Sequence, residues 1–330
     1  MNYLSLTDES FRLPTLENGL PRFHQFDSRS VAAINAALAA GRPLLVRGEP
    51  GVGKTQLAEA AAEKLNRAFL RQVADARTES RDLLYQFDAV MRLAEAQLCG
   101  AQRAEPEAAR QRLELLRFLV PGPLWWAFDP VGAASHVCEH EVRMNSSPLE
   151  LGQNRKRSGN GWVVLIDEID KAETDVPNGL LEALGSGGFT PLGCQQRVEI
   201  SDPPPLVMIA TNEERTLPDA FVRRCVVLHL ALPKEDAKLR AWLVGRGRTH
   251  FEEANQEVLE EAAKIVVRDR KTADEQSLKP LPGQAEYLDL LRAVIRQRKD
   301  SAEQLELLET VANYVVKKPV EMQEQQKDNR

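Results

Sequence analysis

The feature that most constrains the fold is the glycine-rich segment Gly-Glu-Pro-Gly-Val-Gly-Lys-Thr at Gly48–Thr55. It matches the pattern G-x-x-x-x-G-K-T at every fixed position and follows a short apolar run, Pro43–Arg47, that predicts a buried strand. Strong helix formers at Gln56–Leu65 predict a helix directly after it. This order of strand, loop and helix predicts a cradle of backbone amides for phosphate groups, at a helix N-terminus that adds partial positive charge.

Each part of this segment has an expected role in holding a nucleotide triphosphate. We expect Lys54 to reach the β- and γ-phosphates as a point charge, and the Thr55 hydroxyl to ligate Mg²⁺. No N-K-x-D motif for reading guanine occurs, so ATP is the expected nucleotide, with GTP left open. The residues expected to contact the nucleotide are Gly48, Glu49, Pro50, Gly51, Val52, Gly53, Lys54, Thr55 and Gln56.

A second candidate site segment is the apolar run Trp162–Ile166, which is followed by two adjacent carboxylates, Asp167 and Glu168. We expect Asp167 to hold the Mg²⁺ shell, and Glu168 to orient and polarise the attacking water. Acidic residues often follow strands for other reasons. The pairing with the glycine-rich loop is what favours the catalytic interpretation.

Two later segments complete the expected phosphate chemistry. The apolar run Leu206–Ala210 is followed by Thr211 and Asn212, and we expect the Asn212 amide near the γ-phosphate and the attacking water. Arg223 and Arg224 follow as a pair. One of them is expected to stabilise transition-state charge at a neighbouring subunit's site; a surface pair or a bridge to acidic residues of its own domain is the alternative.

Strands and helices are expected to alternate in the first two thirds of the chain, which predicts a parallel α/β sheet. The other expected strands are Ala68–Val73 and Cys225–Leu230. Ser28 is the expected N-cap of the first helix, and Gly41 its C-terminal stop. The expected helices besides Gln56–Leu65 are Val31–Ala40, Glu79–Leu98, Glu107–Leu119, Pro177–Leu184 and Pro218–Arg223.

From Pro233 onward only helices are expected, with Pro233 as the first residue of a helix that runs to about Val244. The later expected helices are Glu257–Val267, Gln284–Arg298 and Ala302–Val316. We therefore expect an N-terminal extension over residues 1–27, an α/β nucleotide-binding domain over 28–232, an all-helical lid domain over 233–318 and a disordered tail over 319–330.

Composition narrows the function classes. The chain of 330 residues carries a net charge of −6, which argues against a broad basic surface for nucleic acid. No apolar run approaches the roughly 20 residues that a membrane helix needs. The four cysteines are widely spaced, which favours reduced thiols and a cytoplasmic protein.

With these four segments in order, the sequence resembles the AAA+ family of P-loop NTPases, and within it the MoxR-like branch. The segment Leu217–Cys225 is similar to the MoxR pattern Leu-Pro-x-Ala-hydrophobic-hydrophobic-Asp-Arg-Phe, which places Arg224 at the arginine-finger position and makes Arg223 the second choice. The resemblance implies an ATP-hydrolysing ring, expected to be a hexamer. It also implies that the ring remodels or activates a partner protein, often one with a von Willebrand A domain. It further implies a helix insert at about 75–150 and a hairpin at about 185–200 before Asn212.

One position departs from the MoxR-like pattern. Where the family places a sensor-2 arginine at the start of a lid helix, this sequence has Glu286, and Arg292 further along that helix is the candidate replacement. Two other functions stay open. One is a nucleic-acid-associated AAA+ motor or loader, because related AAA+ rings handle DNA. The other, which the departure at Glu286 keeps open, is a nucleotide-gated signalling scaffold with slow turnover.

Overall fold

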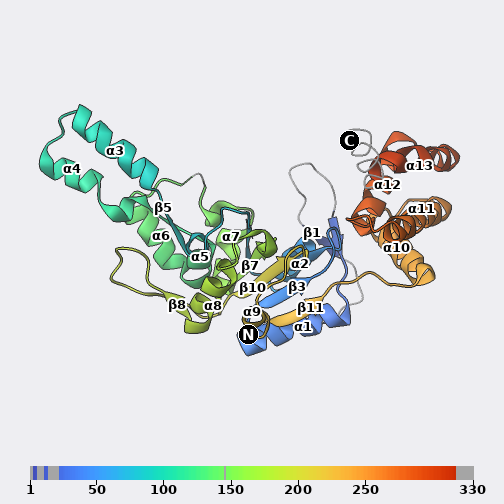
Figure 1. Ribbon diagram of the computed structural model, residues 1–330, viewed down its shortest axis with the longest axis horizontal. Coiled ribbons are helices and arrows are strands. Elements are labelled where there is room, and N and C mark those ends of the chain that lie inside the picture. Colours follow the sequence, from blue (N-terminus) through green and yellow to red (C-terminus); the bar gives the residue numbers. More distant parts are fainter. Residues whose placement is uncertain (1–2, 6–10, 14–21, 145, 317–330) are drawn as a thin grey trace. The chain divides into compact units, whose positions relative to one another are not determined.

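The computed structural model describes residues 3–5, 11–13, 22–144 and 146–316. The largest sheet has five strands in the order β11–β3–β10–β7–β4 (Figure 1). Both neighbours of β7 run parallel to it, and Val164 in β7 lies between Leu70 and Val207. The expected parallel α/β fold is confirmed. The strands are β3 (Leu44–Arg47), β4 (Ala68–Val73), β7 (Trp162–Asp167), β10 (Leu206–Thr211) and β11 (Val226–His229).

The two central strands are buried along their whole length, as expected for parallel strands covered on both faces. Their apolar runs explain why sequence periodicity located them within one residue at each end. Trp126 and Phe128 of helix α5 (Pro123–Phe128) belong to the same buried cluster as Val164 and Ile166 of β7. This cluster fixes the strand that carries the two adjacent carboxylates.

Helix α1 (Ser28–Ala40) begins three residues earlier than expected, and its N-cap is Asp27 rather than Ser28. An Asp27 carboxylate oxygen accepts a hydrogen bond from the Ser30 amide at 2.8 Å. The prediction of Ser28 as N-cap was wrong because the aspartate one residue earlier already satisfies the first-turn amide. Gly41 ends the helix in a left-handed conformation with φ of 59°, as predicted. Helix α2 covers Lys54–Lys64.

The segment predicted as one helix over Glu79–Leu98 is divided into three elements. A 3₁₀ turn, η1 (Ser80–Leu83), leads into β5 (Tyr85–Phe87), and helix α3 (Ala89–Ala101) begins only after Asp88, which caps it through the Met91 amide. Strand β5 pairs with a strand distant in sequence, β6 (Leu119–Pro121), and local helical periodicity contains no signal for such a partner.

The predicted helix Glu107–Leu119 is likewise shorter in the structure. Helix α4 covers Pro106–Arg112, and a 3₁₀ turn, η2 (Leu115–Phe118), leads into β6. The remaining elements before β11 are α6 (Pro130–Glu139), η3 (Pro148–Glu150), α7 (Asn154–Arg157), η4 (Ser158–Asn160), η5 (Ile169–Lys171), α8 (Val176–Ser186), the antiparallel pair β8 (Gly188–Phe189) and β9 (Val198–Glu199), and α9 (Asp219–Val222).

Four helices follow the sheet, as expected: α10 (Asp236–His250), α11 (Gln256–Glu275), α12 (Gln284–Gln297) and α13 (Ser301–Val315). They share a core that includes Leu243, Val266 and Leu291. The prediction that Pro233 starts α10 was wrong, because the helix begins at Asp236 with Glu235 as its N-cap. Helix α11 is longer than predicted and continues past Val267 to Glu275.

The chain forms two compact units. Among the described residues, the first comprises 3–5, 27–46, 58–144 and 146–228. The second comprises 11–13, 22–26, 47–57 and 229–316. The second unit thus joins the four helices with the glycine-rich loop and with the antiparallel strands β1 (Phe11–Leu13) and β2 (Arg22–His24). The domain borders at 28, 232 and 318 stay predictions, and the tail over 319–330 lies outside the described residues.

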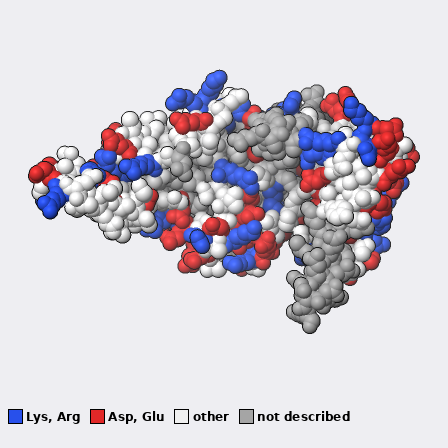
Figure 2. Space-filling view, turned by 90° about the horizontal axis from the view of Figure 1, so that it is seen from above, with Lys and Arg blue, Asp and Glu red and all other residues white. Residues whose placement is uncertain are grey.

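Charges of both signs are interspersed over the described residues on the face shown in Figure 2, in keeping with the net charge of −6. Among the helices of the described part of the chain, none combines the length and the apolar character that crossing a bilayer would require.

Candidate functional site

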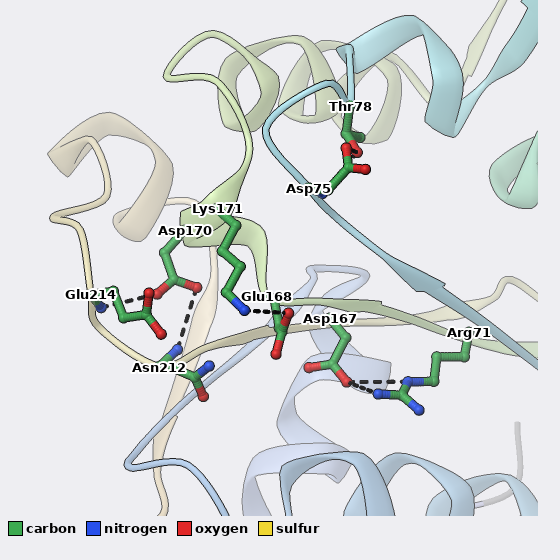
Figure 3. Close-up of polar contacts among 9 residues, drawn as sticks. All are labelled: Arg71, Asp75, Thr78, Asp167, Glu168, Asp170, Lys171, Asn212 and Glu214. Carbon is green, nitrogen blue, oxygen red and sulfur yellow. Dashed lines mark hydrogen bonds and ion pairs between the residues drawn. The ribbon is translucent and has the colours of Figure 1, made fainter. Parts of the chain in front are cut away.

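The first group of candidate residues lies at the carboxyl end of β7, in the first unit (Figure 3). Asp167 is the last residue of this strand, and it is only 4% exposed. One of its carboxylate oxygens accepts hydrogen bonds from Nη2 and Nε of Arg71 at 2.8 and 3.2 Å. Arg71 lies on the neighbouring strand β4, so the ion pair follows directly from the pairing of β4 with β7. Asp167 is therefore a buried carboxylate whose charge is balanced by this pair.

Glu168 follows Asp167 in a backbone conformation that side chains rarely adopt, with φ of 58° and ψ of 40°. A non-glycine residue in this left-handed region costs about 1–2 kcal/mol. The conformation turns the chain from the strand into η5. Lys171 Nζ donates a hydrogen bond to the Glu168 carboxylate at 2.8 Å, and this bond raises the pKa of Lys171. The strained backbone and the lysine together hold the Glu168 carboxylate at the carboxyl end of β7.

A third carboxylate, Asp170, connects this turn with the segment after β10. Its side chain is 2% exposed and accepts hydrogen bonds from the backbone amides of Asn212 at 3.4 Å and Glu214 at 2.9 Å (Figure 3). Asn212, expected from sequence near the γ-phosphate, is thereby held at the same edge as Glu168. Burying a carboxylate is costly without such partners, so Asp170 fixes the two loops to each other.

Sequence reasoning missed Arg71, Asp170 and Lys171. A signal existed for each of them. Arg71 follows the apolar residues Ala68–Leu70 of its strand, and Asp170 and Lys171 are charged residues close after Asp167 and Glu168. What the sequence could not supply was the pairing of Arg71 with a residue far along the chain.

The second group of candidate residues is the glycine-rich loop, in the second unit. Lys54 is 7% exposed, and its Nζ donates hydrogen bonds to the carbonyls of Gly48 at 2.6 Å and Glu49 at 2.9 Å. A Cβ on Gly48 would lie 2.3 Å from the Leu230 carbonyl oxygen, so only glycine fits there. The backbone of the loop therefore curves around the Lys54 ammonium group, which binds two of its carbonyls.

The loop leads directly into helix α2, whose first residues are Lys54, Thr55 and Gln56. The first amides of a helix have no partner within it, and they point toward the space in front of the helix. An anion is stabilised there by these amides and by the helix dipole. The loop and the start of α2 are chemically suited to phosphate groups, and Thr55 adds a hydroxyl oxygen of the kind that Mg²⁺ accepts.

The arginine pair follows the short helix α9, which ends at Val222. Both Arg223 and Arg224 are exposed. Within the described part of the chain, neither side chain forms an ion pair. The structure therefore leaves both guanidinium groups available to a partner, and it does not distinguish between them.

Glu286, at the position where the resemblance expects an arginine, is used locally. Its carboxylate accepts a hydrogen bond from the Gly283 amide at 2.8 Å and so caps its own helix, α12. Arg292, the candidate replacement, forms an ion pair with Asp289 one turn earlier on that helix. Neither residue contacts the glycine-rich loop through a described hydrogen bond.

A comparison with protein-family models identifies the family of this chain. The model of the AAA domain (dynein-related subfamily) matches residues 43–225, more than half of the chain. A comparison with curated proteins gave no significant match.

Two solved structures illustrate the structural likeness. A candidate ATPase from Cytophaga hutchinsonii has 14% identity and a TM-score of 0.38, over 84% of this chain and 78% of that one. The RuvB Holliday junction branch migration motor from Thermotoga maritima has 16% identity and a TM-score of 0.43, over 85% of this chain and 66% of that one. On the family match, which covers the glycine-rich loop and both carboxylates at the end of β7, the chain belongs to the AAA domain family, in its dynein-related subfamily.

Proposed function

We propose that this protein is a MoxR-like AAA+ ATPase of the cytoplasm that binds ATP with Mg²⁺ and hydrolyses its γ-phosphate in an oligomeric ring. The ring remodels or activates a partner protein, such as one with a von Willebrand A domain. The observation that carries the proposal is the strained, lysine-bound Glu168 directly after the buried Asp167, in a family whose domain binds nucleotide.

The chemistry of the donor set fits Mg²⁺. Asp167 offers a buried carboxylate and Thr55 a hydroxyl, both hard oxygen ligands. We assign these two residues to the ion, which when bound neutralises charge on the phosphates. Asp167 is paired with Arg71 in the structure. Binding of Mg²⁺ to Asp167 would weaken this ion pair, and the partly exposed Arg71 guanidinium would then be solvated by water.

The remaining candidate residues have separate roles in the proposed reaction. Lys54 binds the β- and γ-phosphates, and Glu168 orients a water molecule for in-line attack on phosphorus. Asn212, held by Asp170, contacts the attacking water or the γ-phosphate. Arg224, with Arg223 as the second choice, reaches the site of a neighbouring subunit and stabilises charge that develops in the transition state.

The test is the substitution Glu168→Gln, which keeps the shape of the side chain and removes its charge. We expect turnover of ATP to fall by roughly 10²–10⁴-fold while nucleotide binding persists, because only the water-orienting step loses its carboxylate. Glu173→Gln, at an exposed glutamate five residues later, is the matched control and should turn over ATP at the wild-type rate. Phosphate release and binding of a fluorescent ATP analogue measure the two properties. Wild-type turnover by Glu168→Gln would refute the assignment.

A further inference from the structure

An arginine of the helical region contacts the glycine-rich loop, although neither residue 286 nor Arg292 does. Arg270 lies on α11, and its Nη2 donates hydrogen bonds to both carboxylate oxygens of Glu49 at 2.9 and 2.8 Å. Both residues belong to the second unit. The Arg270 side chain is 17% exposed and the Glu49 side chain 45% exposed, so the guanidinium is shielded from water while the carboxylate is partly open to it.

The same guanidinium has a second anchor. Its Nη1 donates a hydrogen bond to the Pro282 carbonyl at 3.0 Å, directly before the start of α12. A planar guanidinium holds its nitrogens in fixed directions, so binding one carbonyl sets the direction in which the other nitrogen points. Arg270 is therefore positioned by the segment before α12 and aimed at Glu49.

The glycine-rich loop also packs on the start of α12. A Cβ on Gly51 would lie 2.9 Å from the Ala285 Cβ, which shows how closely the two backbones approach. The carboxylate of Glu49 thus stands in a loop that is fixed on this side by packing. It cannot simply swing away from phosphate groups without giving up the Arg270 pair.

The electrostatic consequence concerns the nucleotide. A triphosphate carries several negative charges, and an unpaired carboxylate in the loop that binds it would repel it. Because Glu49 is paired with a shielded guanidinium, its charge is balanced before any phosphate arrives. Lys54 already binds two carbonyls of the same loop, so it does not perform this task.

We propose that Arg270, which lies on α11 and not on α12, is a positioning residue for nucleotide binding. Its guanidinium neutralises the Glu49 carboxylate and so reduces the electrostatic repulsion between the glycine-rich loop and a triphosphate. This inference rests on the proposed function. Arg270 acts through Glu49 and is itself positioned by the Pro282 carbonyl before α12.

The test is a double-mutant cycle on the full-length protein, with titration calorimetry of Mg-ATP and Mg-ADP. Arg270→Ala should raise Kd for both nucleotides by about 10-fold, since a charged hydrogen-bonded pair is lost beside the phosphates. Adding Glu49→Gln to Arg270→Ala should restore at least about a third of the nucleotide affinity that Arg270→Ala loses, because the unpaired carboxylate is removed as well. At saturating ATP the kcat of Arg270→Ala should stay within roughly 3-fold of wild type, so the effect lies in KM.

Two controls come from the same helix. Arg268 pairs with Asp269 and Glu309, both on the helical side, so Arg268→Ala tests general disturbance of α11. Lys271 is an exposed cation next to Arg270, so Lys271→Ala tests net charge alone. Both control variants should bind nucleotide within about 2-fold of wild type. Arg270→Lys keeps the charge and should lie between wild type and Arg270→Ala, which covers the case in which the alanine variant folds poorly.

The outcomes separate cleanly. If Arg270→Ala binds nucleotide like the two controls, the inference is wrong. If Glu49→Gln gives no recovery in the Arg270→Ala background, Arg270 serves only as a mechanical tie and its neutralising role is refuted. If the wild-type protein itself binds neither nucleotide, the proposed function fails first, and the Arg270 variants then differ only in stability.

Discussion

At the scale of single residues, three carboxylates within four positions have three different environments. Asp167 is buried against Arg71, Glu168 is held in a strained backbone by Lys171, and Asp170 accepts two backbone amides. Carboxylates this close would repel one another without separate partners. Each of the three carboxylates thus has its own partner: a guanidinium for Asp167, an ammonium group for Glu168 and two backbone amides for Asp170.

His250, at the end of α10, gives a residue-scale prediction for pH dependence. Burial, followed by the positive charges of Arg246 and Arg292, lowers its pKa to about 4. The unfolded chain has a histidine pKa near 6.5 and so binds the proton more readily between pH 6.5 and 4. Stability must therefore fall as pH falls through this window, by up to about 3 kcal/mol from this group.

The measurement is urea unfolding of wild type and His250→Gln at pH 7, 5.5 and 4.5. The variant should show a flatter decline in free energy of unfolding than the wild type, because the titrating group is gone. His229→Gln, at an exposed histidine of the same unit, should keep the wild-type decline. Equal slopes for His250→Gln and wild type would contradict the prediction.

At the scale of elements, the sequence predicted what local pattern determines. Strand β4 was located without error and the central strands within a residue, because buried parallel strands are short, continuous apolar runs. In the region from Glu79 to Leu119 the two predicted helices are present as the shorter α3 and α4, and their outer parts were wrong because β5 and β6 pair with each other across a long stretch of chain. Residue types at the site were predictable, but their partners, such as Arg71 and Asp170, depend on tertiary contacts.

The glycine-rich loop gives an element-scale prediction. Gly51→Ala would force a side chain into φ of 78° and bring its Cβ within 2.9 Å of Ala285. We expect a stability loss of about 1–2 kcal/mol and a nucleotide affinity reduced by about 10-fold or more, because the loop must shift away from α12. Thermal unfolding and titration calorimetry measure the two effects.

Gly41 offers a matched control for this substitution. Its φ of 59° is also left-handed, but a Cβ there would meet nothing within 4 Å. Gly41→Ala should therefore cost about 1 kcal/mol of stability and leave nucleotide affinity unchanged. A similar loss of affinity in both variants would mean that the packing of Gly51 on Ala285 has no special part in binding.

At the scale of the whole molecule, the candidate site residues are divided between the two units. The first unit contains the sheet with its carboxylates and the arginine pair, and the second contains the glycine-rich loop and the four helices. Arg223 and Arg224 are exposed, and the finger role that we propose for one of them would require a neighbouring subunit.

Mixing two inactive variants tests this requirement for a neighbour. Glu168→Gln lacks the carboxylate that we propose orients the attacking water, and Arg224→Ala lacks the arginine that we propose as the finger, so each variant alone should be nearly inactive. In co-expressed mixed rings, an Arg224→Ala subunit keeps Glu168 and receives an intact Arg224 from a Glu168→Gln neighbour. With equal, random mixing, about a quarter of the subunit interfaces are then complete, so ATP turnover should return to about a quarter of wild type. Arg223→Ala in place of Arg224→Ala distinguishes the two arginines, because only the variant that removes the true finger is inactive alone and rescued by mixing. A mixture no more active than its components would show that the arginine acts within its own subunit or not at all.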